Sequence, residues 1–127
     1  KENNLEKNIK IINFVHEKYM YSLYKNAECV VYVSRTGPTN VPPLEALKVG
    51  TPLICSDVYE MKKQVGPASA IFVNPTKISE IQKSIEKILK NKTIKKKLIL
   101  NGKKRIKTLS LDNFSKRFNN IIKESLI

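Results

Sequence analysis

The sequence predicts an α/β protein: a Rossmann-like parallel sheet with helices on its faces and further helices at the C-terminus. Short apolar runs rich in β-branched residues alternate with segments whose apolar residues recur at helical spacing. Such alternation favours β-α-β units and therefore a parallel sheet. The chain has 127 residues, enough for one domain, and its 41% apolar and 28% charged residues exclude disordered and collagen-like classes. The longest apolar run is far too short to cross a bilayer.

Four apolar runs are predicted to form strands. The run Cys-Val-Val-Tyr-Val at 29–33 is apolar without alternation, which is typical of a strand covered on both faces. A β-branched run at 9–14 precedes it, and two shorter runs follow it. A full doubly wound sheet usually has six strands, so the predicted sheet, with about four, is incomplete. The predicted strands are 9–14, 29–33, 52–55 and 70–73.

Helices are predicted between these strands and after the last one. Pro42 and Pro43 suit a first helical turn, where the missing N–H groups cost nothing, and Gly50 suits the end of that helix. Thr76 and Ser110 are each expected to cap the helix that follows them. The predicted helices are 16–26, 42–49, 58–65, 78–89, 93–108 and 111–126.

The loop 34–41 follows a predicted strand and precedes a helix, which is where parallel sheets bind ligands. Its backbone amides and the dipole of the following helix would favour a phosphate group. Glu45 is expected in the first turn of that helix, and its carboxylate can accept hydrogen bonds from both hydroxyls of a ribose. A second interpretation stays open, in which Glu45 is a carboxylate favoured only by the helix dipole.

A series of short motifs from residue 34 to residue 57 follows one known pattern in order and spacing. The pattern is Ser, a short loop, Pro-Pro-Leu-Glu-Ala, then Gly-x-Pro-Val-Ile and Ser-Asp. The matching residues are Ser34, Pro42-Pro43-Leu44-Glu45-Ala46, Gly50-Thr51-Pro52-Leu53-Ile54 and Ser56-Asp57. By these motifs the chain resembles the C-terminal, donor-binding domain of GT-B glycosyltransferases of the retaining family 4 type, called glycosyl transferases group 1. Weaker landmarks at 13–15, 23–27, 66–70 and 74–75 extend the resemblance over nearly the whole chain.

The resemblance implies a set of donor-binding residues in and after the loop 34–41. Glu45 corresponds to the second glutamate of the family's Glu-x7-Glu pair and is expected to bind the ribose hydroxyls. The first glutamate falls at Gly37, so no catalytic side chain is predicted, and retention would proceed without an evident protein nucleophile. No metal and no cofactor are expected besides the nucleotide-diphosphate-sugar donor, and Arg35 stays open between phosphate contact and solvation. The predicted donor-binding residues are Glu45, Gly37, Thr39, Asn40, Val41 and Pro42.

The resemblance also implies that residues 1–127 are part of the C-terminal domain, without the family's N-terminal acceptor-binding domain. The whole enzyme would transfer a sugar from the nucleotide-linked donor to a glycan or a lipid-linked acceptor in polysaccharide biosynthesis. Its expected place is the cytoplasm, with peripheral contact to the inner face of the membrane. The chain alone is expected to be inactive, and exposed sheet edges favour its self-association. The last helix is expected to pack against the acceptor-binding domain.

The net charge of +13 favours an anionic partner. Only three of the 24 basic residues are arginine, however, and AT-rich codons would account for part of the lysine excess. The segment from Lys90 to Lys107 holds nine basic residues and no acidic one, so a solvated helix face and contact with anionic lipid are both open. Nucleic acid is not the expected partner, because no aromatic residue interleaves the charges. The alternative function is a non-catalytic basic module that binds anionic membrane or nucleic acid through this segment.

The other candidate residues are given structural roles. His16, the only histidine, has no carboxylate partner or nucleophile that marks it as catalytic. Cys29 and Cys55 lie in apolar runs without CxxC spacing and are expected to be buried free thiols. Asp57 is expected to cap the next helix, and Ser34 to end a strand. The helix 16–26 carries an apolar stripe that is expected to lie in the core: Tyr19, Met20, Leu23 and Tyr24.

Overall fold

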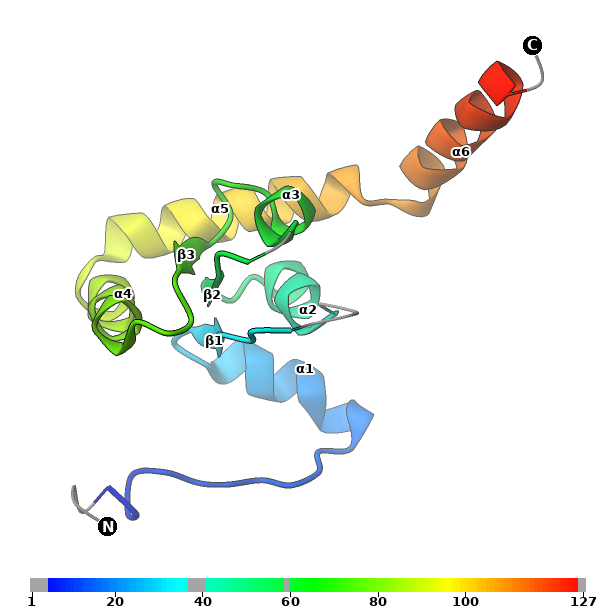
Figure 1. Ribbon diagram of the computed structural model, residues 1–127. Helices are drawn as coiled ribbons and strands as arrows, with labels where there is room; N and C mark the ends of the chain where they lie inside the picture. The colour runs from blue at the N-terminus through cyan, green and yellow to red at the C-terminus, as the bar shows by residue number, and fades with distance from the viewer. Residues whose placement is uncertain (1–4, 37–40, 59, 126–127) are drawn as a thin grey trace.

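The computed structural model describes residues 5–36, 41–58 and 60–125, and its centre is a three-stranded parallel sheet (Figure 1). The strands are β1 (Val30–Tyr32), β2 (Leu53–Ser56) and β3 (Ile71–Val73), in the spatial order β1-β2-β3. Val30 pairs with Leu53 across β1 and β2, and Ile54 pairs with Ile71 across β2 and β3. All three strands therefore end at one edge of the sheet, as the predicted β-α-β order requires.

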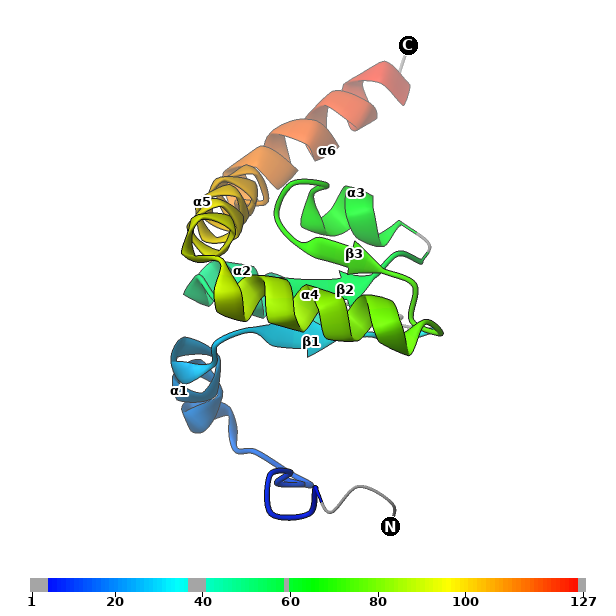
Figure 2. The ribbon, with the colours of Figure 1, turned by 90° about the vertical axis from the view of Figure 1, so that its left-hand side faces the viewer.

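Helices cover both faces of this sheet. They are α1 (Glu17–Asn26), α2 (Val41–Val49), α3 (Met61–Val65), α4 (Ile78–Lys90), α5 (Lys92–Thr108) and α6 (Leu111–Ser125). Figure 2 shows α4 in front of the sheet with α2 behind it, and α5 passing the end at which the strands begin. In both views α6 extends away from the rest of the molecule (Figures 1 and 2). The parallel α/β architecture predicted from the sequence is confirmed.

Two apolar cores, one on each face of the sheet, follow from the alternation of side chains along β2. Leu53 and Cys55 pack with Leu47 of α2 and Val65 of α3. Ile54 belongs to the other core, where α4 and α5 cover the sheet. Every residue of β2 is buried, so β2 is the strand covered on both faces.

Helix α5 approaches α2 closely because residue 102 is glycine. A Cβ atom at Gly102 would lie 2.8 Å from Leu47 Cδ2, inside van der Waals contact. Farther along α5, the guanidinium of Arg105 donates to the carbonyl oxygens of Lys63 at 2.7 Å and Gln64 at 2.9 Å. These carbonyls lie at the C-terminal end of α3, where a cation also complements the helix dipole. One face of α5 therefore fixes both α2 and α3.

The predicted strand at 9–14 is not formed, so the sheet has three strands where about four were expected. Residues 9–14 are irregular, Phe14 is 81% exposed, and Figure 1 shows this blue segment running clear of the sheet. In the doubly wound order 3-2-1-4-5-6, two strands lie between the third strand and the fourth, which would correspond to 9–14 and β1. The described residues contain neither of the intervening strands. A β-branched segment without a neighbouring strand has no ladder to join.

Strand β1 and helix α1 are more exposed than the sequence predicts. Within the described part of the chain β1 pairs only with β2, so it is an edge strand and Val31 is partly exposed. Tyr19 and Leu23 are also exposed, and no residue of α1 is buried, so the predicted core stripe on α1 is wrong. Tyr24 alone of that stripe packs against a core cluster. The outer side of α1 has no element of the described chain over it.

Helix caps are partly as predicted. Ser110 Oγ accepts the N–H of Asn113 at 3.3 Å at the start of α6, which confirms that cap. His16 has a structural role as the N-cap of α1, since its Nδ1 accepts the N–H of Lys18 at 3.3 Å. Thr76 does not cap α4, because a neighbouring loop side chain holds it.

Candidate functional site

Glu45 lies on α2 and faces α1. Because α2 begins at Val41, Glu45 is the fifth helical residue, and the expectation that it lies in the first turn is wrong. Its Oε2 atom accepts a hydrogen bond from the hydroxyl of Tyr24 at 2.9 Å, and the side chain is half-buried. The carboxylate is therefore held by a side chain of α1, in a region that the helix N-terminus does not reach.

A cavity of about 400 Å³ lies beside this carboxylate, between α1 and α2. Its wall contains carboxylate and ammonium groups together with tyrosine rings and an aliphatic surface. The Glu45–Tyr24 hydrogen bond forms part of this wall, and Lys48 contributes an exposed positive charge. Such a surface can accept hydrogen bonds from hydroxyl groups and cover the apolar face of a ring. The lining residues are Glu17, Met20, Tyr21, Tyr24, Glu45, Lys48 and Val49.

Tyr24 is a firm hydrogen-bond donor. Burial, then the hydrogen bond to Glu45 and the charge of that carboxylate, raise the pKa of Tyr24 to about 12. The phenol is therefore protonated across the neutral range, and it donates to Glu45 throughout that range.

The other predicted donor-binding residues are placed differently. Val41 is exposed and Pro42 is partly exposed at the start of α2, and neither lines the cavity beside Glu45. Gly37, Thr39 and Asn40 lie outside the described residues. Of the predicted residues that the structure describes, only Glu45 lines this cavity.

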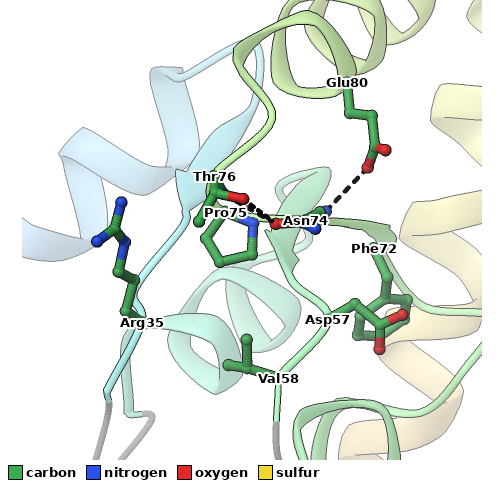
Figure 3. A pocket seen from close by; sticks show the side chains of 8 residues that line it. All are labelled: Arg35, Asp57, Val58, Phe72, Asn74, Pro75, Thr76 and Glu80. Carbon is green, nitrogen blue, oxygen red and sulfur yellow. Dashed lines mark hydrogen bonds between the residues drawn. The ribbon is translucent and has the colours of Figure 1, made fainter.

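A second cavity, of about 600 Å³, lies beyond the edge at which all three strands end (Figure 3). Asp57, which follows β2, forms an ion pair with Lys62, whose Nζ atom lies 2.6 Å from Asp57 Oδ2. The expectation that Asp57 caps the next helix is therefore wrong, because α3 starts later, at Met61, with Glu60 in the N-cap position. Arg35 follows β1 and has no hydrogen bond or ion pair within the described part of the chain. The lining residues are Arg35, Asp57, Val58, Phe72, Asn74, Pro75, Thr76 and Glu80.

Asn74 organises the wall of this second cavity on the side of β3. Its Oδ1 atom accepts the N–H of Thr76 at 2.9 Å and the hydroxyl of Thr76 at 2.7 Å, which explains why Thr76 does not cap α4. The N–H of Asn74 donates to Glu80 Oε2 at 2.9 Å (Figure 3). That bond, followed by contact with Lys77, holds the pKa of Glu80 below its usual range. Asn74 is predicted only as part of the weaker landmark at 74–75, and neither Asn74 nor Glu80 is predicted as a site residue.

Cys55 is buried as expected, whereas Cys29 is only partly buried, and Ser34 follows the end of β1 at Tyr32. Burial, followed by the charge of Asp57, raises the pKa of Cys55 to about 12, and burial raises that of Cys29. Both cysteines are free thiols that are protonated at neutral pH, so neither is an activated nucleophile. Ser34 donates its hydroxyl to the carbonyl of Thr36, and its own carbonyl accepts the hydroxyl of Ser56 at 2.7 Å.

The basic segment 90–107 falls mainly on α5, and some of its charges are used within the fold. Lys95 forms an ion pair with Glu28, which joins α5 to the loop before β1. Arg105 binds the end of α3, as described above. The outer side of α5 keeps a group of exposed lysines: Lys96, Lys97, Lys104 and Lys107.

The described residues 5–36, 41–58 and 60–125 contain no group of three or more His, Cys, Asp or Glu side chains able to hold a metal ion. Within the same residues, none of the helices has the length and apolar character needed to span a membrane.

Comparisons with known proteins agree on one family. The family model described as "Glycosyl transferases group 1" matches residues 1–105. The chain is 28% identical over 114 residues to an uncharacterized glycosyltransferase, MJ1607, of Methanocaldococcus jannaschii, covering 88% of this chain and 29% of that protein. It is 25% identical over 126 residues to the alpha-1,3/1,6-mannosyltransferase ALG2 of Dictyostelium discoideum, covering 98% of this chain and 30% of that protein.

The fold has a close counterpart among solved structures. Sucrose-phosphate synthase (tll1590) from Thermosynechococcus elongatus superposes with a TM-score of 0.78 at 23% identity, covering 97% of this chain and 31% of that one. This likeness confirms the Rossmann-like fold class. The chain spans less than a third of the length of these proteins.

Proposed function

The chain belongs to the glycosyl transferases group 1 family, and we propose that it is the donor-binding part of a retaining glycosyltransferase. The donor is a nucleotide-diphosphate sugar, and the acceptor is a glycan or a lipid-linked sugar. The lysines on the outer side of α5 suit an enzyme that works beside the anionic inner face of a membrane in the cytoplasm. The assignment of donor binding to this chain depends on one observation, the half-buried carboxylate of Glu45 beside the cavity between α1 and α2.

The chemistry of that cavity suits the ribose of a nucleotide. A carboxylate has about four lone-pair positions, and the bond from Tyr24 uses one of them, so Glu45 can still accept from two ribose hydroxyls. Lys48 supplies a positive charge near the same space, which favours a nucleotide over a neutral sugar.

The role of the chain in the reaction is to bind and orient the donor. Position 37, where the family's first glutamate falls, is glycine, and the thiols of Cys29 and Cys55 are protonated. Precise placement of the donor sugar lowers the barrier to transfer without a protein nucleophile. We expect the 127 residues by themselves to bind donor without turning it over, since they span less than a third of the related glycosyltransferases.

An amide-resolved NMR titration of this chain tests the proposal. We expect UDP-glucose, GDP-mannose or ADP-glucose to shift residues 17–24 and 41–46 saturably. Glu45→Gln keeps the shape of the side chain and removes its charge, and it should weaken binding about tenfold or more. Glu124→Gln makes the same charge change on exposed α6 and should leave binding unchanged. A folded chain in which none of the three nucleotide sugars shifts these residues would refute the proposal.

A further inference from the structure

Tyr24 forms hydrogen bonds to α2 and to the residues just after it, one through its side chain and one through its backbone. Its hydroxyl donates to Glu45 Oε2 at 2.9 Å, and its backbone carbonyl accepts the hydroxyl of Thr51 at 2.7 Å. Thr51 is buried and follows Gly50, whose φ of +87° reverses the chain after α2. Tyr24 therefore has a fixed position relative to the helix that carries Glu45.

The bond between Tyr24 and Glu45 is the one side-chain hydrogen bond that joins α1 to α2 within the described residues. No residue of α1 is fully buried, and Tyr24 is half-buried. Because burial and the nearby carboxylate raise the pKa of Tyr24 to about 12, its hydroxyl is a permanent donor under physiological conditions. Glu45 thus always has one oxygen anchored, and the anchored carboxylate borders the cavity between α1 and α2.

We propose that Tyr24 is a positioning residue for Glu45, and that its hydroxyl orients the carboxylate so that the carboxylate accepts hydrogen bonds from the ribose of the donor. This inference rests on the proposed function. Tyr24 acts through Glu45: one lone pair of Oε2 takes the phenol proton, which leaves Oε1 and the second lone pair of Oε2 for the ligand. Without the phenol, the carboxylate has a wider range of orientations and must lose that freedom when the donor binds.

The discriminating measurement is the preference for ribose over 2′-deoxyribose. Calorimetric titration of this chain would use UDP-glucose, GDP-mannose and ADP-glucose, each paired with its 2′-deoxyribose analogue. We expect Tyr24→Phe to weaken binding of the ribose form about three- to tenfold, which is the size of effect that losing one ordinary hydrogen bond produces. Binding of the 2′-deoxy form should change much less, so the ratio of the two affinities shrinks.

Two control variants distinguish a role of Tyr24 in orienting Glu45 from a role in holding α1 against α2. Thr51→Val removes the other bond to Tyr24 and leaves the phenol in place, so it should keep the ribose preference. Tyr19→Phe removes an exposed hydroxyl on the same helix, outside this cavity, and should change nothing. Equal weakening of both donor forms by Tyr24→Phe, or loss of the ribose preference in Thr51→Val, would show that Tyr24 only holds the helix and would overturn the inference.

A double-mutant cycle completes the test. If Tyr24 acts through Glu45, Tyr24→Phe should cause no further loss of affinity in the Glu45→Gln background. A full additional loss in that background would contradict the inference. The proposed function fails separately, when the parent chain binds none of the three donors or when Glu45→Gln alone binds as well as the parent.

Discussion

Tyr24 also makes the free energy of unfolding depend on pH. Its pKa is raised from 10.0 to about 12 in the folded chain. A group whose pKa is higher in the folded state contributes stability that is complete below its unfolded pKa and is lost as the pH rises through the folded pKa. We therefore expect the free energy of unfolding to fall more steeply between pH 10 and about pH 12 in the parent chain than in Tyr24→Phe. Urea denaturation across that range measures the difference, and parallel curves for the two chains would contradict it.

Gly102 is a second position where one residue determines how two elements meet. A Cβ atom there would lie 2.8 Å from Leu47 Cδ2, and Leu47 is buried in the core between α2 and α3. Gly102→Ala should gain about 1 kcal/mol of helix propensity and lose about 1–3 kcal/mol to overpacking. We expect a net loss of about 1 kcal/mol in the free energy of unfolding, measured by urea denaturation.

The neighbouring core side chain provides the control for Gly102→Ala. In a Leu47→Ala background the methyl group has space, so the same glycine substitution should be neutral or stabilising. Equal destabilisation in both backgrounds would mean that the contact between α5 and α2 is not the cause.

At the scale of elements, local sequence pattern predicted each strand and helix that the described residues contain. The apolar runs at 29–33, 52–55 and 70–73 contain β1, β2 and β3. The run at 9–14 has the same β-branched composition but no adjacent strand, and composition carries no information about neighbours. The apolar stripe on α1 fails for the same reason, since helical spacing does not say what covers the stripe.

The candidate site was predictable only in part. The spacing of the motifs identified Glu45, because such a motif can be read from a short segment of consecutive residues. The partner of Glu45 is Tyr24, which lies 21 residues earlier on another helix, and no local pattern pairs the two. Asn74 and Glu80, by contrast, lie near each other in the sequence, and their hydrogen bond closes a loop at the start of α4 that the Asn-Pro pair signals.

The exposed lysines of α5 are predicted to bind anionic lipid surfaces. Each lysine near an anionic lipid surface contributes about 1 kcal/mol, which is roughly a fivefold change in affinity. We expect the chain to bind vesicles that contain phosphatidylserine at low salt, and Lys97→Gln with Lys104→Gln to weaken that binding more than about tenfold. Vesicle co-sedimentation measures this, with pure phosphatidylcholine vesicles as the blank.

A matched pair of lysine substitutions on α4 distinguishes binding through the face of α5 from binding through net charge alone. Lys83→Gln with Lys87→Gln removes the same charge from exposed positions of α4. That variant should bind nearly as well as the parent. Equal weakening by the two pairs would favour the simpler interpretation, in which the lysines of α5 are a solvated face of a basic protein.

At the scale of the whole molecule, α6 has no packing partner among the described residues. Every described residue of α6 is exposed, including Phe114 at 61% and Phe118 at 53%, whose rings stack with their centroids 6.1 Å apart. The apolar residues of α6 recur at helical spacing and form a stripe on one side: Leu111, Phe114, Phe118, Ile121 and Ile122. Contiguous exposed apolar surface of this kind marks an interaction site, and the family resemblance implies that the acceptor-binding domain covers it in a complete enzyme.

In the 127-residue chain this stripe should instead pair with a second copy. We expect light scattering after size exclusion to show a mass that rises with protein concentration, because two amphipathic helices can bury their apolar sides against each other. Phe114→Gln with Phe118→Gln should return the chain to a monomer. Ile78→Gln with Leu89→Gln replaces two exposed apolar residues of α4, one of them 80% exposed, and should leave the association intact. If the α4 variant dissociates the chain equally well, or if the parent is monomeric throughout, α6 is not the surface through which this chain associates.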